Sequence, residues 1–274
     1  FFHPDYYISN FFRKGNKMES GRLCYESSED AVSYNVFTEL ASNNTLQDLV
    51  RKLTKPQDIK ENIDLYLWGS KIDLQSGELI PYPHLKEIRD NHLGEKDIRF
   101  KTEPDIMLVI PKKLVICIEA KFGSKNPIAM DKEEKEGEKP KRMDRLIEQY
   151  YNGNELIKGY DIFDFPSKPK FLFYEQLFRN IAFAASMAQK EGHTNWLVVN
   201  LRSQHVMNLK RGKPESMPVM RSVQSILKPE YKKRFLHLTW EKIYEIAVEN
   251  NPKLYNLSWY LKNKSLNCSR AFNI

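Results

Sequence analysis

Two short hydrophobic segments joined by a three-residue turn predict a β-hairpin near the middle of the chain. Residues 106–110 read Ile-Met-Leu-Val-Ile and residues 114–118 read Leu-Val-Ile-Cys-Ile, with Pro-Lys-Lys between them. A tight turn places Asp105, which precedes the first strand, beside Glu119 and Lys121 at the end of the second. Glu119 and Lys121 should point the same way, because successive side chains of a strand alternate between faces. The hairpin therefore predicts two carboxylates and a lysine at one strand end, projecting toward solvent.

Hydrophobic periodicity predicts helices and strands on both sides of the hairpin. Apolar residues recur at helical spacing after Ser28, and Glu29 in the first turn favours a helix start. Residues 175–188 have the spacing of an amphipathic helix and residues 195–201 that of a buried strand, so together they predict an α/β crossover. The other expected elements are a helix over 45–53, a strand over 63–68, and helices over 219–227 and 240–250. This order predicts an α/β fold with a mixed central sheet flanked by helices.

Length and composition are typical of a soluble globular protein. The 274 residues with 41% hydrophobic content can fill the core of one large domain or two small ones. No segment has the apolar length of a membrane span and the first residues do not resemble a signal peptide, so we expect a cytoplasmic protein. Three dispersed cysteines and six dispersed histidines predict neither a disulfide framework nor a zinc site. The net charge of +7 suits a polyanionic partner without proving one.

One sequence motif indicates which chemistry these residues could carry out. Pro104-Asp105, followed after thirteen residues by Glu119-Ala120-Lys121, resembles the signature of the PD-(D/E)XK superfamily, the restriction-endonuclease-like nucleases. The resemblance implies that Asp105 and Glu119 bind Mg²⁺ or Mn²⁺ through hard oxygen ligands, with the backbone carbonyl of Ala120 as a further ligand. Lys121 would hold or deprotonate the attacking water and offset charge in the transition state, with its pKa lowered by the neighbouring divalent ion. The pattern leaves open whether one or two metal ions take part.

The same resemblance implies a domain organisation. Residues 27–202 carry the elements of the restriction-endonuclease-like core in the expected order, after an N-terminal segment over 1–26. Residues 203–274 are expected to form a helical extension packed on this core. Within the core, residues 71–100 read as an insertion and residues 124–142 as a charged loop.

Further site positions rest on the resemblance. A carboxylate on the first helix often completes the metal site in this superfamily, and Glu29 resembles the helix-opening glutamate of archaeal Holliday-junction resolvases. Glu39 is the alternative, and a helix-capping acid without a metal role also explains Glu29. Gln176 and Arg179 resemble glutamine and basic residues that support the site in some members, by orienting the motif lysine or contacting a phosphate. Residues 149–151, Gln-Tyr-Tyr, are a competing match, and an exposed helix face is the plainer explanation of either.

These features together predict a divalent-metal-dependent endonuclease, with DNA favoured over RNA as its substrate. The front of the chain over 28–37 and the back, with Tyr260, Lys262, Lys264 and Ala271-Phe272, are similar to bacterial proteins of the superfamily associated with restriction or phage defence. The alternative is a nucleic-acid-binding or assembly module that retains the nuclease fold without cutting, but such a module would not need Asp105, Glu119 and Lys121 together. A general scaffold, the third reading, would bind no metal. The sequence leaves open the strandedness and specificity of the substrate, and whether a homodimer or a partner subunit forms.

Overall fold

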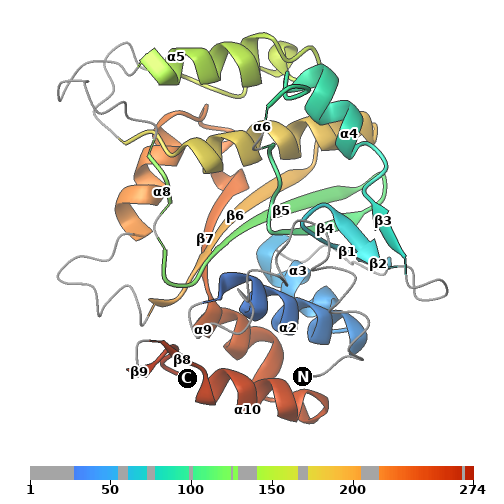
Figure 1. The fold of residues 1–274 in the computed structure, drawn as a ribbon, viewed down its shortest axis with the longest axis vertical. Helices are drawn as coiled ribbons and strands as arrows, with labels where there is room; N and C mark the ends of the chain where they lie inside the picture. The colour runs from blue at the N-terminus through green and yellow to red at the C-terminus, as the bar shows by residue number, and fades with distance from the viewer. Residues whose placement is uncertain are drawn as a thin grey trace.

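The computed structural model describes residues 28–54, 61–72, 78–98, 101–124, 126–128, 141–165, 172–204, 216–266 and 269–274. These residues form a seven-stranded mixed sheet in the order β3-β2-β1-β4-β5-β6-β7 (Figure 1). Neighbouring strands are antiparallel from β3 to β5, whereas β5, β6 and β7 are parallel. The strands are β1 Asp64–Leu67, β2 Ser70–Ile72, β3 Leu79–Pro81, β4 Ile106–Ile110, β5 Leu114–Lys121, β6 Trp196–Arg202 and β7 Phe235–Thr239. The predicted α/β fold with a mixed central sheet is confirmed.

The predicted hairpin consists of β4 and β5. The two strands pair Ile106 with Ile118 and Ile110 with Leu114, and Lys112 in the turn has a left-handed φ of 58°. Because Ile106 faces Ile118, Asp105 lies across from Glu119 at the end of the pair. The chain returns through α6 (Glu175–Lys190) to β6, which is parallel to β5, as the predicted crossover requires.

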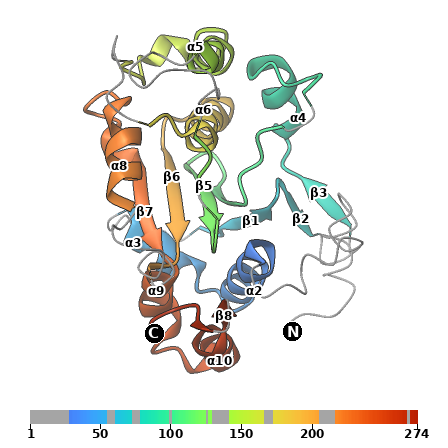
Figure 2. The ribbon, with the colours of Figure 1, turned by 60° about the vertical axis from the view of Figure 1, so that its left-hand side comes forward.

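Helices cover both faces of the sheet and enclose two hydrophobic cores (Figure 2). Ile116 and Ile118 point into the first core with α2 (Glu29–Ser42), α3 (Leu46–Thr54), α9 (Trp240–Ile243) and α10 (Tyr255–Asn263). Val115 and Cys117 point into the second core with α4 (Leu85–Glu87), α5 (Lys141–Ile147), α6 and α8 (Ser216–Ser225). Shorter elements are η2 Ile88–His92, η3 Glu148–Asn152, η4 Lys158–Tyr160, η5 Lys232–Arg234, η6 Tyr244–Val248, η7 Pro252–Leu254, β8 Ser265–Leu266 and β9 Ser269–Arg270. The alternation along β5 therefore separates the faces as predicted.

Some segments contribute to the sheet in ways that the sequence pattern did not indicate. The segment over 71–100 does lie between β1 and the hairpin, but β2 and β3 extend the sheet and Ile88 and Leu93 are fully buried in the second core. The segment over 203–274 contributes helices and also the edge strand β7. The N-terminal segment over 1–26 and most of the charged loop over 124–142 lie outside the described residues. No helix in the described part of the chain has both the length and the apolarity needed to cross a membrane.

Candidate active site

The two acidic residues of the hairpin and its lysine meet where β4 begins and β5 ends. Asp105 Oδ2 accepts a hydrogen bond from the backbone N–H of Ala120 at 2.9 Å. Lys121 Nζ lies 2.6 Å from Glu119 Oε1, so the two side chains on the same face of β5 form an ion pair. Glu119 has no exposed surface and Lys121 is 8% exposed. The predicted convergence is therefore present, but the pair is buried and does not project toward solvent as the sequence suggested.

Glu29 reaches this strand end from the first helix of the described chain. Its Oε2 accepts hydrogen bonds from the backbone N–H of Phe122 at 2.6 Å and from the Ser124 hydroxyl at 2.8 Å. Ser28 caps the same helix by accepting from the backbone N–H of Ala31. Glu39 lies near the far end of α2, where Oε1 accepts a hydrogen bond from Asn43. Of the two helix carboxylates, Glu29 is thus the one that contacts the residues following Lys121.

Burial and neighbouring charges shift the pKa values of three groups at this strand end. Burial raises the pKa of Asp105 well above its ordinary value, and the negative charge of Glu119 raises it further. Burial also raises the pKa of Glu119, although the neighbouring Lys121 ammonium acts in the opposite direction. Burial lowers the pKa of Lys121, but the carboxylates of Glu119, Asp105 and Glu29 outweigh it, so the net shift is upward. Without a divalent ion, Lys121 is therefore a charged hydrogen-bond donor at neutral pH.

The second partner of Glu119 is Asn180, which the sequence analysis did not single out. Asn180 on α6 donates from Nδ2 to Glu119 Oε2 at 2.8 Å, so both oxygens of the buried carboxylate have a partner. It is 1% exposed and directly precedes a run of buried apolar residues over 181–185. A polar side chain in such an apolar stretch must find a partner, and this was the available signal.

Arg179, the residue before Asn180, belongs to a different buried cluster. Its guanidinium donates to Glu95 Oε1 at 3.1 Å and to Thr102 Oγ1 at 3.0 Å, and it lies over the ring of Tyr150. Tyr150 donates from its hydroxyl to the same Glu95 oxygen at 2.7 Å, so the cluster brings together the two competing sequence matches. Glu95 has no exposed surface, and a buried carboxylate needs this compensation. These contacts are those of a buried ion pair, and the role of Arg179 in supporting the site stays a prediction.

Gln149 and Gln176, the glutamines of the two competing motif matches, lie in different surroundings. Gln149 donates from Nε2 to the backbone carbonyl of Leu93 at 2.8 Å and thereby holds the end of η2. Gln176 is half-buried on α6, one helix turn before Asn180. Its assigned role in supporting the site stays a prediction.

The parallel strands extend the polar end of β5 sideways. In register, Asn200 of β6 lies beside Glu119 and Arg202 lies beside Lys121, while His237 of β7 lies beside Asn200. Burial lowers the pKa of His237 to about 4, and the positive charge of Arg202 contributes to the decrease. His237 is therefore neutral at physiological pH. A row of polar side chains thus runs across the carboxyl ends of three parallel strands, which is where ligands bind in many open α/β sheets.

Comparison with known proteins identifies the family. Residues 24–264 match the family described as "Restriction Endonuclease associating with ARP". The chain belongs to this family. No curated protein and no solved structure matches the chain significantly. The description is that of a restriction-endonuclease-type nuclease, and the mixed sheet flanked by helices is consistent with a restriction-endonuclease-like core.

The candidate site of this family member offers the kind of ligand atoms that a hard divalent cation prefers. Asp105 and Glu119 offer carboxylate oxygens, which Mg²⁺ and Mn²⁺ prefer. Burial is the main cause of the raised pKa values of both groups, and a bound cation would stabilise the ionised carboxylates that burial disfavours. The described residues contain no group of three or more His, Cys, Asp or Glu side chains arranged to hold a metal ion. The fit therefore rests on two carboxylates of the hairpin, with Glu29 close enough to add to their electrostatic repulsion.

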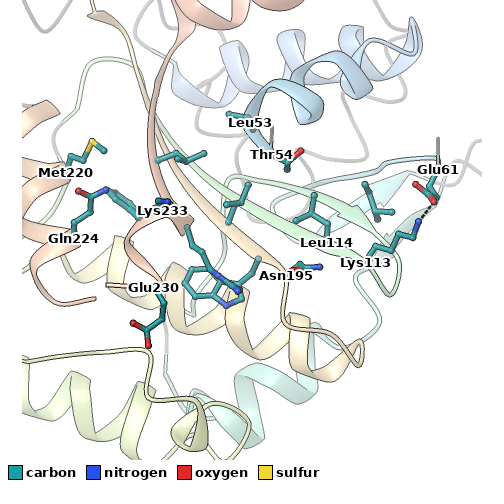
Figure 3. Close-up of a pocket in the computed structure, with 16 residues that line it drawn as sticks. Leu53, Thr54, Glu61, Lys113, Leu114, Asn195, Met220, Gln224, Glu230 and Lys233 are labelled. Atoms are coloured by element: carbon teal, nitrogen blue, oxygen red, sulfur yellow. Dashed lines mark hydrogen bonds and ion pairs between the residues drawn. The ribbon is translucent and has the colours of Figure 1, made fainter. Parts of the chain in front are cut away.

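A cavity of about 660 Å³ lies at the other end of the parallel strands (Figure 3). Its lining includes Leu114 at the start of β5, Trp196 at the start of β6 and Phe235 at the start of β7. Glu119 and Lys121 are at the opposite end of β5. The cavity and the candidate active site of this family member are therefore separate features.

Proposed function

We propose that this chain is a nuclease of the PD-(D/E)XK type that hydrolyses phosphodiester bonds of DNA with the help of Mg²⁺ or Mn²⁺. The observation that carries the proposal is the buried Glu119–Lys121 ion pair beside Asp105 at the end of β5. Burying these charges costs free energy that a purely structural strand end does not require. Membership in a restriction endonuclease family supports nuclease chemistry.

Each residue has a distinct role in this proposal. The carboxylates of Asp105 and Glu119 and the backbone carbonyl of Ala120 would hold the cation, with Glu29 completing the site from α2. When bound, the cation supplies Lewis acidity toward the phosphate and acidifies water. The Lys121 ammonium would hold the attacking water by a hydrogen bond and stabilise negative charge on the phosphate oxygens.

Asn180 acts in this scheme as a positioning residue. Its amide donates to Glu119 Oε2, while Lys121 donates to Oε1, so the plane of the carboxylate is held from both sides. A carboxylate fixed in this way can present its remaining lone pairs in one orientation. The three hydrogen-bonded groups come from β5 and α6, which are packed against each other in the second core.

DNA is favoured over RNA because the family description names a restriction endonuclease. A role in restriction or phage defence is part of the proposal, and the description supports the restriction part. The description also names an association with ARP, so a partner subunit is part of the proposal alongside a homodimer.

The direct test is cleavage by the purified protein. Plasmid, linear duplex, single-stranded DNA and RNA would each be incubated with Mg²⁺, Mn²⁺, Ca²⁺ or EDTA. We expect DNA fragments with Mg²⁺ or Mn²⁺, loss of cleavage in Glu119→Gln, and wild-type cleavage in Glu249→Gln, which changes an exposed glutamate after η6. Cleavage in EDTA, or full activity of Glu119→Gln, would overturn the proposed mechanism.

Calcium separates cutting from binding. Ca²⁺ takes the same oxygen ligands but is larger and acidifies water less, so it should support retention of DNA without turnover. DNA retention that is the same with every ion and in EDTA, with no product under any condition, would instead favour the non-cutting module.

A further inference from the structure

Helix α10 presents two aromatic side chains to solvent. Tyr255 is 70% exposed and Trp259 is 60% exposed, the highest values among the large hydrophobic residues of the described chain. Their spacing of four residues places them on one side of the helix, while Leu257 and Leu261 on the other side are buried in the first core. We call the exposed side, with Tyr255, Trp259 and Lys262, the α10 aromatic face; Lys262 is exposed, and its Nζ lies 5.7 Å from the centroid of the Tyr244 ring. Packing within the described chain does not account for this exposure.

The segment that carries this face is basic in sequence, whereas the neighbouring η6 region carries the exposed Glu245 and Glu249. Residues 250–274 contain no Asp or Glu, whereas the basic residues in this stretch are Lys253, Lys262, Lys264 and Arg270. Exposed aromatic rings interspersed with lysines are the combination that single-stranded nucleic acids recognise, because bases stack on the rings and phosphates attract the cations. An interface for an apolar protein surface would not require a segment free of acidic residues.

Lys264, which follows α10, connects the end of this helix to the strand end of the candidate active site. Lys264, just after α10, places Nζ over the ring of Phe122 at 5.6 Å, and Phe272 contacts the same ring at 5.5 Å between centroids. Phe122 directly follows Lys121, and its backbone N–H donates to Glu29. Figure 2 shows the tips of β5, β6 and β7 pointing toward the part of the molecule that contains α9, α10 and β8.

The geometry of α10 gives the distances that a bound nucleic-acid strand would have to cover. At about 1.5 Å of rise per residue, Trp259 lies about 6 Å along the axis from Asn263 at the end of α10, and Tyr255 about 6 Å farther. A strand whose phosphate lies at the end of β5 could thus pass Lys264 and reach both rings within a few nucleotides.

We propose that the α10 aromatic face binds the single-stranded nucleic acid that flanks the scissile phosphate. Tyr255 and Trp259 would stack on successive bases, and Lys262 would pair with the phosphate backbone. This inference rests on the proposed nuclease function, because it assigns the face to the substrate of that site.

Trp259 provides its own probe. The other tryptophans, Trp68, Trp196 and Trp240, are buried, so a ligand on α10 should quench the emission of Trp259 selectively. A dT20 oligonucleotide would be titrated into the full chain in EDTA, which prevents metal-dependent cutting. We expect quenching that saturates with the oligonucleotide and that disappears in Trp259→Phe, where affinity measured by anisotropy is largely kept.

Truncating the rings separates the proposal from its alternatives. Trp259→Ala and Tyr255→Ala should each weaken oligonucleotide affinity by roughly 5- to 150-fold. Tyr160→Ala, which removes a 42% exposed ring near the second core, should bind like wild type. Lys262→Ala should reduce the steepness with which affinity falls as salt rises.

The outcomes also distinguish this inference from the proposed function. Unchanged affinity and unchanged cleavage in Trp259→Ala would overturn the inference alone. Oligonucleotide binding that depends on Trp259, without cleavage under any ion, would support the face and count against the nuclease. Self-association of the chain that Trp259→Ala abolishes, with oligonucleotide affinity unchanged, would overturn the inference in favour of docking between copies.

Discussion

Replacing Lys121 by methionine should destabilise the metal-free protein more than replacing Glu119 by glutamine. The ammonium lies 2.6 Å from the fully buried Glu119 carboxylate and is also attracted by Asp105 and Glu29. With all groups ionised, these three carboxylates and the Lys121 ammonium sum to two negative charges, before the neighbouring Arg202 guanidinium is counted. Lys121→Met raises this excess to three charges, whereas Glu119→Gln lowers it to one and leaves the lysine with two other acids nearby.

The expected magnitude follows from the burial of the pair. Removing one partner of a buried ion pair costs about 3–5 kcal/mol, which corresponds to a Tm lower by roughly 6–20 °C for a chain of this size. We expect the loss of stability in Lys121→Met to fall in this range and the loss in Glu119→Gln to be much smaller. The Glu119→Gln/Lys121→Met double variant should recover most of the loss, because two neutral side chains leave neither partner of the pair as an uncompensated charge.

Thermal melts followed by circular dichroism in EDTA at neutral pH test this order. Added Mg²⁺ should raise the Tm of Lys121→Met, since a cation bound to the folded state compensates the added negative charge. Equal destabilisation by the two single variants, or additive losses in the double variant, would refute the description of Glu119 and Lys121 as a buried pair within an acidic cluster.

Three further predictions test other parts of the structure. Glu29→Gln should weaken the Mg²⁺ dependence of cleavage while Glu39→Gln behaves like wild type, and an unaffected Glu29→Gln would leave only a helix-capping role. Arg179→Ala should lower the free energy of unfolding by about 3–5 kcal/mol without changing the Mg²⁺ dependence, and intact stability with lost cleavage would contradict its structural role. Neutral His237, whose pKa falls from 6.5 to about 4 on folding, contributes stability that is complete above pH 6.5 and is lost as the pH falls toward 4. His237→Asn should therefore flatten the acid decline by up to about 3 kcal/mol in urea titrations between these pH values, and an unchanged decline would show that the imidazole is not buried.

The sequence by itself determined the local elements of the site. Strand alternation and a tight turn depend on residues close together in the chain, so the hairpin and the shared face of Glu119 and Lys121 followed from the hydrophobic pattern alone. The crossover through α6 to β6 followed for the same reason, because helical and strand periodicities are local properties. The Pro104-Asp105 and Glu119-Ala120-Lys121 motifs then indicated the class of chemistry.

Only the tertiary structure decided which distant residues meet at that strand end. Glu29 binds the Phe122 backbone across 93 positions of sequence, and Asn180 binds Glu119 across 61. The sequence could indicate that Asn180 and Arg179 need partners, because buried polar groups are paired. It could not specify that Asn180 donates to Glu119 and Arg179 donates to Glu95. These pairings depend on the order of strands and on the packing of α2 and α6 on opposite faces of the sheet. Hydrophobic periodicity shows which side of an element is buried, but it does not specify the neighbour against which that side packs.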